Sequence, residues 1–234
     1  EKQKVIISEG VSKRANVEWT IVHEGGSSSK HRVSIHEKPD WAKGYDVVVH
    51  NECFAGVADE AFVENIVKAH EEGTPAVMIH CAMHNYRVNP KAYMRWFKAC
   101  GVRSHNHGPK TPIVVTVQKT DHPIMKGIAT EWTTPQGELY NIAEIFDGTQ
   151  VLATGVRRDK GDKTPQACYW TAKFGKARVF GTSIGHHNET MEAEPYLDVL
   201  TRGILWSAGK LNDDGTPVAG YGPVKQDEKT AAAE

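Results

Sequence analysis

Short hydrophobic runs and amphipathic stretches follow one another along the first hundred residues of the chain. The apolar runs predict three strands, at 17–23, 45–50 and 74–80. The helical spacing of apolar residues predicts three helices, at 1–15, 59–72 and 90–100, and Gly73 and Gly101 end the last two. Because strands and helices alternate, we expect a parallel sheet with helices on both faces.

After residue 110 the pattern changes from alternation to consecutive strands. Apolar runs predict strands at 113–117 and 151–156, followed by a hairpin of 167–172 and 174–180 that turns at Phe174-Gly175-Lys176. A last amphipathic helix is expected over 195–209. We therefore expect one domain over residues 1–211, with antiparallel strands added to its sheet in the C-terminal half. The segment 212–234 is rich in Gly, Pro and charge, which predicts an extended or disordered tail.

Three histidine clusters stand after hydrophobic runs, at Ile79 to His84, Ser104 to Pro109 and Ser183 to His187. Ligands of open parallel sheets bind beyond the carboxyl ends of the strands, where the first and third clusters are expected. Imidazole is the side chain that carries protons or binds metals near neutral pH. The pattern therefore predicts a histidine-rich site at one edge of the sheet.

Composition excludes several classes of function. Of the 234 residues 24% are charged and the formal net charge is −1, which gives no broad attraction to nucleic acid or anionic lipid. No apolar run approaches the roughly 20 residues that span a bilayer, and the first residues are no signal peptide. We expect a soluble protein, with a secreted or periplasmic location favoured over the cytoplasm. No Gly-rich loop demands a nucleotide cofactor.

The cysteines are too widely spaced for a zinc ribbon or a dense disulfide framework; they are Cys53, Cys81, Cys100 and Cys168. Free, mostly buried thiols are expected, and one disulfide stays open. Cys81 lies beside His80 and close to His84, and neighbouring imidazolium groups lower the pKa of a thiol. Cys81 is therefore a candidate nucleophile that has to be weighed against a structural thiol.

Several motifs together resemble the trehalose-utilisation (ThuA-like) family of the class I glutamine-amidotransferase-like superfamily. They are Tyr45 to Val49, Gly73 to His80, His122-Pro123-Ile124 with Gly127-Ile128, Glu138-Leu139-Tyr140, and Gly175 to Phe180 leading to Gly185-His186. The resemblance covers roughly residues 40–210. It implies a flavodoxin-like three-layer α/β sandwich with a mostly parallel sheet, and it implies a carbohydrate as the ligand.

Two departures from the family pattern limit what the resemblance implies. Family members open with a strand and a Gly/His-containing loop, whereas this chain begins on the following helix, which leaves open whether its first strand is missing. Related amidotransferases carry a nucleophilic cysteine on a Gly-flanked turn after the third strand. Here that turn is His80-Cys81-Ala82-Met83, and the flanking glycines are absent. We therefore do not expect Cys81 to be a nucleophile or the protein to be an amidotransferase.

The expected site residues follow from the clusters and from the resemblance. We expect His80, Glu138 and His186 to be catalytic, and they are also the candidate ligands of a divalent metal ion. His80 and His84 stand four residues apart, His105 and His107 alternate in a loop, and His122 is held extended by the following proline. Glu138 and Tyr140 share a face of an extended segment. The expected substrate-binding residues are His84, His105, His107, His122 and Tyr140.

This site predicts an enzyme that acts on a sugar or keto-sugar derivative, as a hydrolase, lyase or isomerase. One imidazole or Glu138 would be the general base, and Tyr140 would orient a hydroxyl. A divalent metal, if bound, would polarise an oxygen and acidify a water. The alternative is a saccharide-binding protein without catalysis, which would need aromatic platforms more than titrating groups. The expected partner is a small carbohydrate, and a homo-oligomer stays open.

Overall fold

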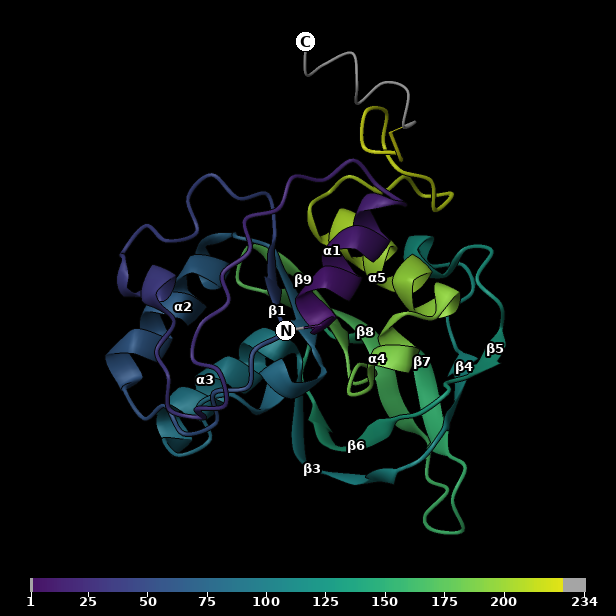
Figure 1. Ribbon diagram of the computed structural model, residues 1–234, viewed down its shortest axis with the longest axis horizontal. Helices are drawn as coiled ribbons and strands as arrows, with labels where there is room; N and C mark the ends of the chain where they lie inside the picture. Colours follow the sequence, from purple (N-terminus) through teal and green to yellow (C-terminus); the bar gives the residue numbers. More distant parts are fainter. Residues whose placement is uncertain (1, 225–234) are drawn as a thin grey trace.

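The computed structural model describes residues 2–224, without the side chain of His105. Its centre is a sheet in the order β1-β2-β9-β8-β7-β4-β5 (Figure 1). These strands are β1 (Val48–His50), β2 (Ala76–Ile79), β4 (Ile113–Val117), β5 (Glu131–Thr133), β7 (Gln150–Arg157), β8 (Gln166–Phe174) and β9 (Ala177–Thr182). The pairings of β1 with β2 and of β2 with β9 are parallel, and those from β9 to β5 are antiparallel. The predicted flavodoxin-like α/β class is confirmed, including the antiparallel strands of the C-terminal half.

Helices cover both faces of the sheet and make three layers (Figure 1). One apolar cluster joins the sheet to α2 (Glu60–Glu72) and α3 (Pro90–Cys100). A second cluster joins the other face to α1 (Lys2–Ser12) and α5 (Glu194–Ser207), beside the short α4 (Asn188–Met191). Three 3₁₀ turns complete the elements: η1 (Ser34–Glu37), η2 (His80–His84) and η3 (Pro123–Met125). The four helices predicted from spacing are confirmed.

Local capping explains why α2 and α3 begin and end where the pattern predicts. The Asp59 carboxylate accepts a hydrogen bond from the Phe62 N–H, and the Asn89 side chain accepts from Lys91 and Ala92. These acceptors satisfy N–H groups that have no partner within the helix. At the other end of α3, Gly101 has a φ of 83°, a left-handed conformation that a residue with a side chain rarely adopts.

A second, two-stranded antiparallel sheet carries part of the histidine-rich sequence. It pairs β3 (Val102–Lys110) with β6 (Glu138–Ile145), and His107 lies opposite Tyr140. The expectation that His105 and His107 lie in a loop is therefore wrong. Residues 104–110 lack the apolar alternation of a half-buried strand, and their strand conformation comes from pairing with β6 at an irregular register.

The strand predicted at 17–23 is not formed in the structure. The segment is extended, but it belongs to no sheet of residues 2–224, and Ile21 and Val22 are largely exposed. Its alternating β-branched residues fit a strand, yet a strand needs a hydrogen-bonded neighbour to satisfy its backbone. The pattern therefore correctly predicted the extended conformation and wrongly predicted the pairing.

Two of the four cysteines are bonded to each other. A disulfide joins Cys53, in the loop after β1, to Cys81 in η2, whereas Cys100 and Cys168 are free and buried. The interpretation of four free thiols is therefore wrong for the first pair and confirmed for the second. Because the bonded cysteines are 28 residues apart in sequence, only the fold brings them together.

Removing this disulfide is expected to lower the free energy of unfolding by about 3 kcal/mol, because a cross-link of this separation restricts the unfolded chain. Urea unfolding of the Cys53→Ser/Cys81→Ser variant and of wild type measures the difference. Wild type treated with a phosphine reductant should shift to the midpoint of the variant. Equal midpoints for oxidised wild type and variant would contradict the expectation.

The C-terminal segment continues beyond α5 without helix or strand. Residues 212–224 return to the end of α1, where the Asn16 N–H donates to the Tyr221 carbonyl. Residues 225–234, the rest of the predicted tail, lie outside the described residues. Among residues 2–224, none of the helices combines the length and the apolar character that crossing a bilayer requires.

Candidate functional site

Three segments distant in sequence bring charged and imidazole side chains to one edge of the sheet. β2 ends directly before His80, and β9 ends three residues before Gly185-His186. The first residue of β6, Glu138, lies between the two imidazoles. Because β2 and β9 are parallel neighbours, their carboxyl ends meet at this edge. The sheet topology thus assembles the three residues that were expected to be catalytic.

His80 is held in an unusual backbone conformation and by one specific hydrogen bond. Its φ is +43°, a left-handed value that costs a residue with a side chain about 1–3 kcal/mol and is concentrated at functional sites. Its Nδ1 lies 2.7 Å from the Ser183 carbonyl oxygen. A carbonyl only accepts, so Nδ1 carries a proton. The other ring nitrogen, Nε2, lies 3.3 Å from Glu138 Oε2.

Glu138 is a buried carboxylate surrounded by three imidazoles. Its Oε2 lies 3.3 Å from His186 Nδ1, and its Oε1 lies 3.4 Å from His107 Nδ1. Burial alone would raise the pKa of Glu138, but the hydrogen bond with His80 and the charges of His186 and His107 outweigh burial and lower it. Glu138 is therefore ionised at neutral pH.

His186 completes the cluster from the loop after β9. Its side chain is about one-third exposed, at 32%, so the cluster opens to solvent on this side. Desolvation lowers the pKa of His186 more than the nearby Glu138 carboxylate raises it. A neutral His186 and an ionised Glu138 therefore coexist at neutral pH, and neutral imidazole with carboxylate is a set of ligands that binds divalent transition metals.

The spacing of the donor atoms fits a single cation. One ligand atom each from His80, Glu138 and His186 lies within 4.8 Å of the others. Ligands at zinc-like bond lengths in a tetrahedral site stand about 3.4 Å apart, close to the 3.3 Å from each imidazole to Glu138. The bond from His80 Nδ1 to the Ser183 carbonyl is the outer contact that orients a metal-binding histidine. This arrangement can hold a divalent cation and leave positions open toward solvent.

Of the other predicted residues, Tyr140, His84 and His107 border this cluster. The buried Tyr140 ring stacks on His84, with centroids 4.2 Å apart, and contacts His80 at 4.4 Å. Burial raises the pKa of Tyr140, so its phenol stays protonated at neutral pH. His84 binds the Ser104 hydroxyl behind Tyr140 and is buried. His107 is half exposed, which places it between Glu138 and solvent.

One predicted substrate-binding residue, His122, does not join the cluster in the structure. His122 caps η3, where its Nδ1 accepts from the Ile124 N–H, and its ring packs near Trp206. Trp206 also contacts Arg178, at the amino end of β9, so His122 lies at the opposite end of the parallel strands. His105 belongs to β3, but its side chain lies outside the described residues.

The sequence shows similarity to a known family over most of its length. The model of the ThuA family, described as trehalose utilisation, matches residues 5–207. The chain belongs to the ThuA family. This match spans all three segments that form the histidine and glutamate cluster. A comparison with curated proteins finds no match.

Several solved structures have a similar fold. A ThuA-like protein of Parabacteroides merdae aligns with a TM-score of 0.67 at 19% identity, covering 97% of this chain and 93% of that one. A ThuA-like protein of Bacteroides uniformis gives 0.63 at 17% identity, with 79% and 78% covered. A cytoplasmic protein of Salmonella typhimurium gives 0.54 at 12% identity, with 74% and 78% covered. At these identities the likeness concerns the fold.

The disulfide removes the nucleophile hypothesis for Cys81 of this ThuA-family chain. Its sulfur is bonded to Cys53, so it carries no thiolate that could attack a substrate. The expectation that Cys81 is no nucleophile agrees with this pairing. The disulfide instead links η2, which begins with His80, to the loop after β1.

Gly185 contributes to the site by leaving room for His80. Its φ is +146°, and a Cβ atom there would lie 3.1 Å from Ile79 Cγ2 and from Tyr196 Oη, and 3.4 Å from His80 Cβ. Only glycine therefore lets the loop after β9 pass this close to His80. The signal in the sequence is a glycine directly before the last histidine cluster.

Replacing Gly185 with alanine is expected to weaken Zn²⁺ binding about tenfold, because the new methyl group displaces His80 or His186 by tenths of an ångström. Gly209→Ala is the matched control, since Gly209 has a φ of +71° and no atom within 4 Å of an added Cβ. Gly185→Ala should lose more stability than Gly209→Ala, because only its methyl group meets neighbouring atoms, and only Gly185→Ala should lose affinity in calorimetric titrations of the folded proteins. Equal Zn²⁺ affinity for both would show that the Gly185 contact does not position the ligands.

Proposed function

We propose that this chain is an enzyme that acts on a sugar or keto-sugar derivative and holds a divalent cation between His80, Glu138 and His186. The observation that carries the proposal is the convergence of an ionised carboxylate and two imidazoles at 3.3 Å, on an edge of the sheet that opens to solvent. Membership of the trehalose-utilisation family supports a carbohydrate as the substrate. A hydrolase, a lyase or an isomerase would each use such a site.

The residues around the cation position have separate roles in this proposal. The Ser183 carbonyl fixes the ring of His80 with Nδ1 protonated, so that Nε2 is the atom that would bind the cation. Glu138 contributes Oε2 to the cluster, while Oε1 remains beside His107 as a proton acceptor. When bound, the cation would polarise a keto or hydroxyl oxygen and acidify a water.

His107 is suited to moving a proton between the site and solvent. Its Nδ1 donates to the Gly108 carbonyl, at 2.9 Å, and lies 3.4 Å from Glu138 Oε1. The half-exposed ring can meet a bound sugar, unlike the buried His84. The protonated phenol of Tyr140, packed on His80, is in reach of the same edge to orient a hydroxyl.

The test measures both the binding and the turnover of trehalose and of keto-sugar derivatives by proton NMR. The cation-loaded wild type and the control Glu131→Gln, an exposed glutamate of β5, should convert the substrate, whereas Glu138→Gln should not. Binding of a sugar without turnover by all three proteins would favour the alternative, a saccharide-binding protein. Neither binding nor turnover of any sugar would contradict the carbohydrate assignment.

For the location we propose a secreted or periplasmic protein, and the support is the disulfide. Disulfides persist in oxidising compartments and are rare in the cytosol, and Cys53 is bonded to Cys81. The Salmonella structure is described as cytoplasmic, which concerns that protein. Rapid alkylation of the producing cells under denaturing conditions, followed by mass spectrometry, should label two cysteines, Cys100 and Cys168. Labelling of all four would contradict this location.

A further inference from the structure

The solvent side of the histidine cluster carries a lysine without a carboxylate partner. Lys110, the last residue of β3, lies directly opposite Glu138 in the ladder of β3 and β6. Opposite residues of a ladder share a face, with their Cβ atoms about 5 Å apart. Glu138 nevertheless directs its carboxylate to the imidazoles, and Lys110 is exposed and makes no ion pair with any of residues 2–224. Its ammonium group can therefore pair with a ligand of the site.

The charge of Lys110 acts on the cluster itself. Desolvation lowers the pKa of His186, and the positive charge of Lys110 contributes to the same shift. In the described part of the chain, the ion pairs of the cluster imidazoles all go to Glu138. Lys110 and the cluster thus share one electrostatic environment, in which Glu138 supplies the negative charge.

A second positive side chain, Arg87, lies near the other end of the irregular half of β3. Its Nε donates to Tyr93 Oη at 3.5 Å, and Tyr93 Oη donates to the Ser104 carbonyl. Burial lowers the pKa of His84 to about 3, and the charge of Arg87 adds to this effect. Positive groups therefore stand at both ends of the stretch 104–110.

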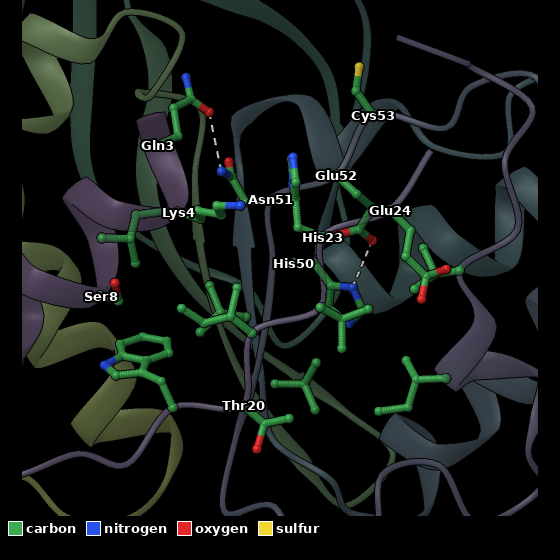
Figure 2. Close-up of a pocket in the computed structure, with 18 of the residues that line it drawn as sticks. Gln3, Lys4, Ser8, Thr20, His23, Glu24, His50, Asn51, Glu52 and Cys53 are labelled. Atoms are coloured by element: carbon green, nitrogen blue, oxygen red, sulfur yellow. Dashed lines mark hydrogen bonds and ion pairs between the residues drawn. The ribbon is translucent and has the colours of Figure 1, made fainter. Parts of the chain in front are cut away.

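The first turn of α1 adds positive charge on the side of His186. Gln3 Nε2 donates to the His186 carbonyl at 3.2 Å. Within the helix as described, this turn holds Lys2 and Lys4 but no acidic residue. Figure 2 shows Gln3 and Lys4 on this turn, next to Asn51 at the end of β1. The amino end of a helix carries a partial positive charge as well.

A bound divalent cation would leave this edge of the sheet with an excess of positive charge. The single negative charge of Glu138 offsets half of the charge of the cation, and the neutral imidazoles of His80 and His186 offset none. Lys110 lies beside this excess without a counter-charge. The hydroxyl groups of a neutral sugar do not offset like charges, whereas an anionic group offsets both the cation and the ammonium group.

We propose that the substrate of the site is a sugar derivative with an anionic group, a carboxylate or a phosphate, that pairs with Lys110 beside the cation position. This inference rests on the proposed function, because it names the substrate class of the same site. Lys110 binds the anionic group directly. Arg87 and the first turn of α1 strengthen the positive field that attracts it.

The test compares two sugars with the same carbon chain. The acid 2-keto-D-gluconate has a carboxylate where D-fructose has a neutral hydroxymethyl group. Isothermal titration of the Zn²⁺-loaded wild type should show the acid binding about 10- to 100-fold more tightly, the range expected for a hydrogen bond to a charged group. D-Fructose 1-phosphate is titrated in parallel, and the tighter of the two anions identifies the group as a carboxylate or a phosphate.

Variants of Lys110 show whether this residue causes the preference. Lys110→Gln should lose about tenfold or more of the preference for the anion, and Lys110→Arg, which keeps the charge, should retain most of it. The control Lys173→Gln removes an exposed lysine of β8, opposite Arg178 at the amino end of β9, and should bind as wild type does. Equal binding of anions and fructose by wild type, or an unchanged preference in Lys110→Gln, would overturn the proposal.

Proton NMR of the same mixtures separates this proposal from the proposed function. Conversion of D-fructose with no preference for either anion would overturn the anionic substrate and leave the proposed enzyme intact. Binding of an anion that depends on Lys110, without its conversion, would support the anionic ligand and count against catalysis. Binding of none of the three compounds would overturn both.

Discussion

Glu138→Gln is expected to lower the affinity for Zn²⁺ by more than a hundredfold. The glutamine keeps the size of the side chain but removes its negative charge. Its amide nitrogen cannot bind a cation held between His80 and His186. Loss of an outer contact to a metal ligand already lowers metal affinity by about 10- to 100-fold, so loss of a charged ligand should lower the affinity by more than this. Isothermal titration of the metal-free protein with Zn²⁺ measures the affinity.

The control for this variant is Glu131→Gln, which changes the net charge equally at an exposed position of β5. It should bind Zn²⁺ as wild type does. Thermal unfolding without metal should be similar for both variants, because Glu138→Gln also relieves the burial of a charge. Wild-type affinity in Glu138→Gln would show that the carboxylate is not a ligand.

A second large effect is expected in the dependence of stability on pH. Burial, and then the charge of His50, lower the pKa of His36 to about 4 and that of His70 to about 3. Both histidines titrate near pH 6.5 when unfolded, so the unfolded chain binds more protons below that pH. The stability that depends on these two neutral histidines is therefore fully present above pH 6.5. As the pH falls from 7 to 4, the two together lower the free energy of unfolding by about 6 kcal/mol.

The variant His36→Phe separates this effect from general acid unfolding. The buried His36 ring packs against Trp41, and its Nδ1 has no hydrogen-bond partner among the described residues, so an aromatic replacement is tolerated. The stability of His36→Phe should fall with pH by roughly half as much as that of wild type, measured by urea unfolding at pH 7, 6 and 5. The control His23→Phe, at an exposed position, should keep the wild-type slope. An unchanged slope for His36→Phe would contradict the assignment.

Much of the fold could be predicted because the decisive signals are local. Asp59 and Asn89 cap their helices within three residues, and Gly101 ends α3 by its own conformation. The apolar runs of β2 and β9 needed no distant information to indicate buried strands. For the site, the strand ends supplied His80 and His186, whereas Glu138 rested on the resemblance to the family.

What could not be predicted depends on contacts between distant segments. The strand β3 forms because β6 pairs with it, although its own sequence is polar. Conversely, residues 17–23 have a strand sequence and no partner strand. The pairing of Cys53 with Cys81 and the placement of His122 far from the cluster both follow from the sheet order, which no local pattern encodes.

The most direct test of the proposed site is elemental analysis of the protein purified without chelators, beside the His80→Ala/His186→Ala double variant. We predict about one equivalent of a divalent transition metal in wild type and its loss in the double variant, because the variant leaves Glu138 alone at the cation position. Wild type without metal, or a double variant that retains it in equal amount, would contradict a cation held by His80, Glu138 and His186.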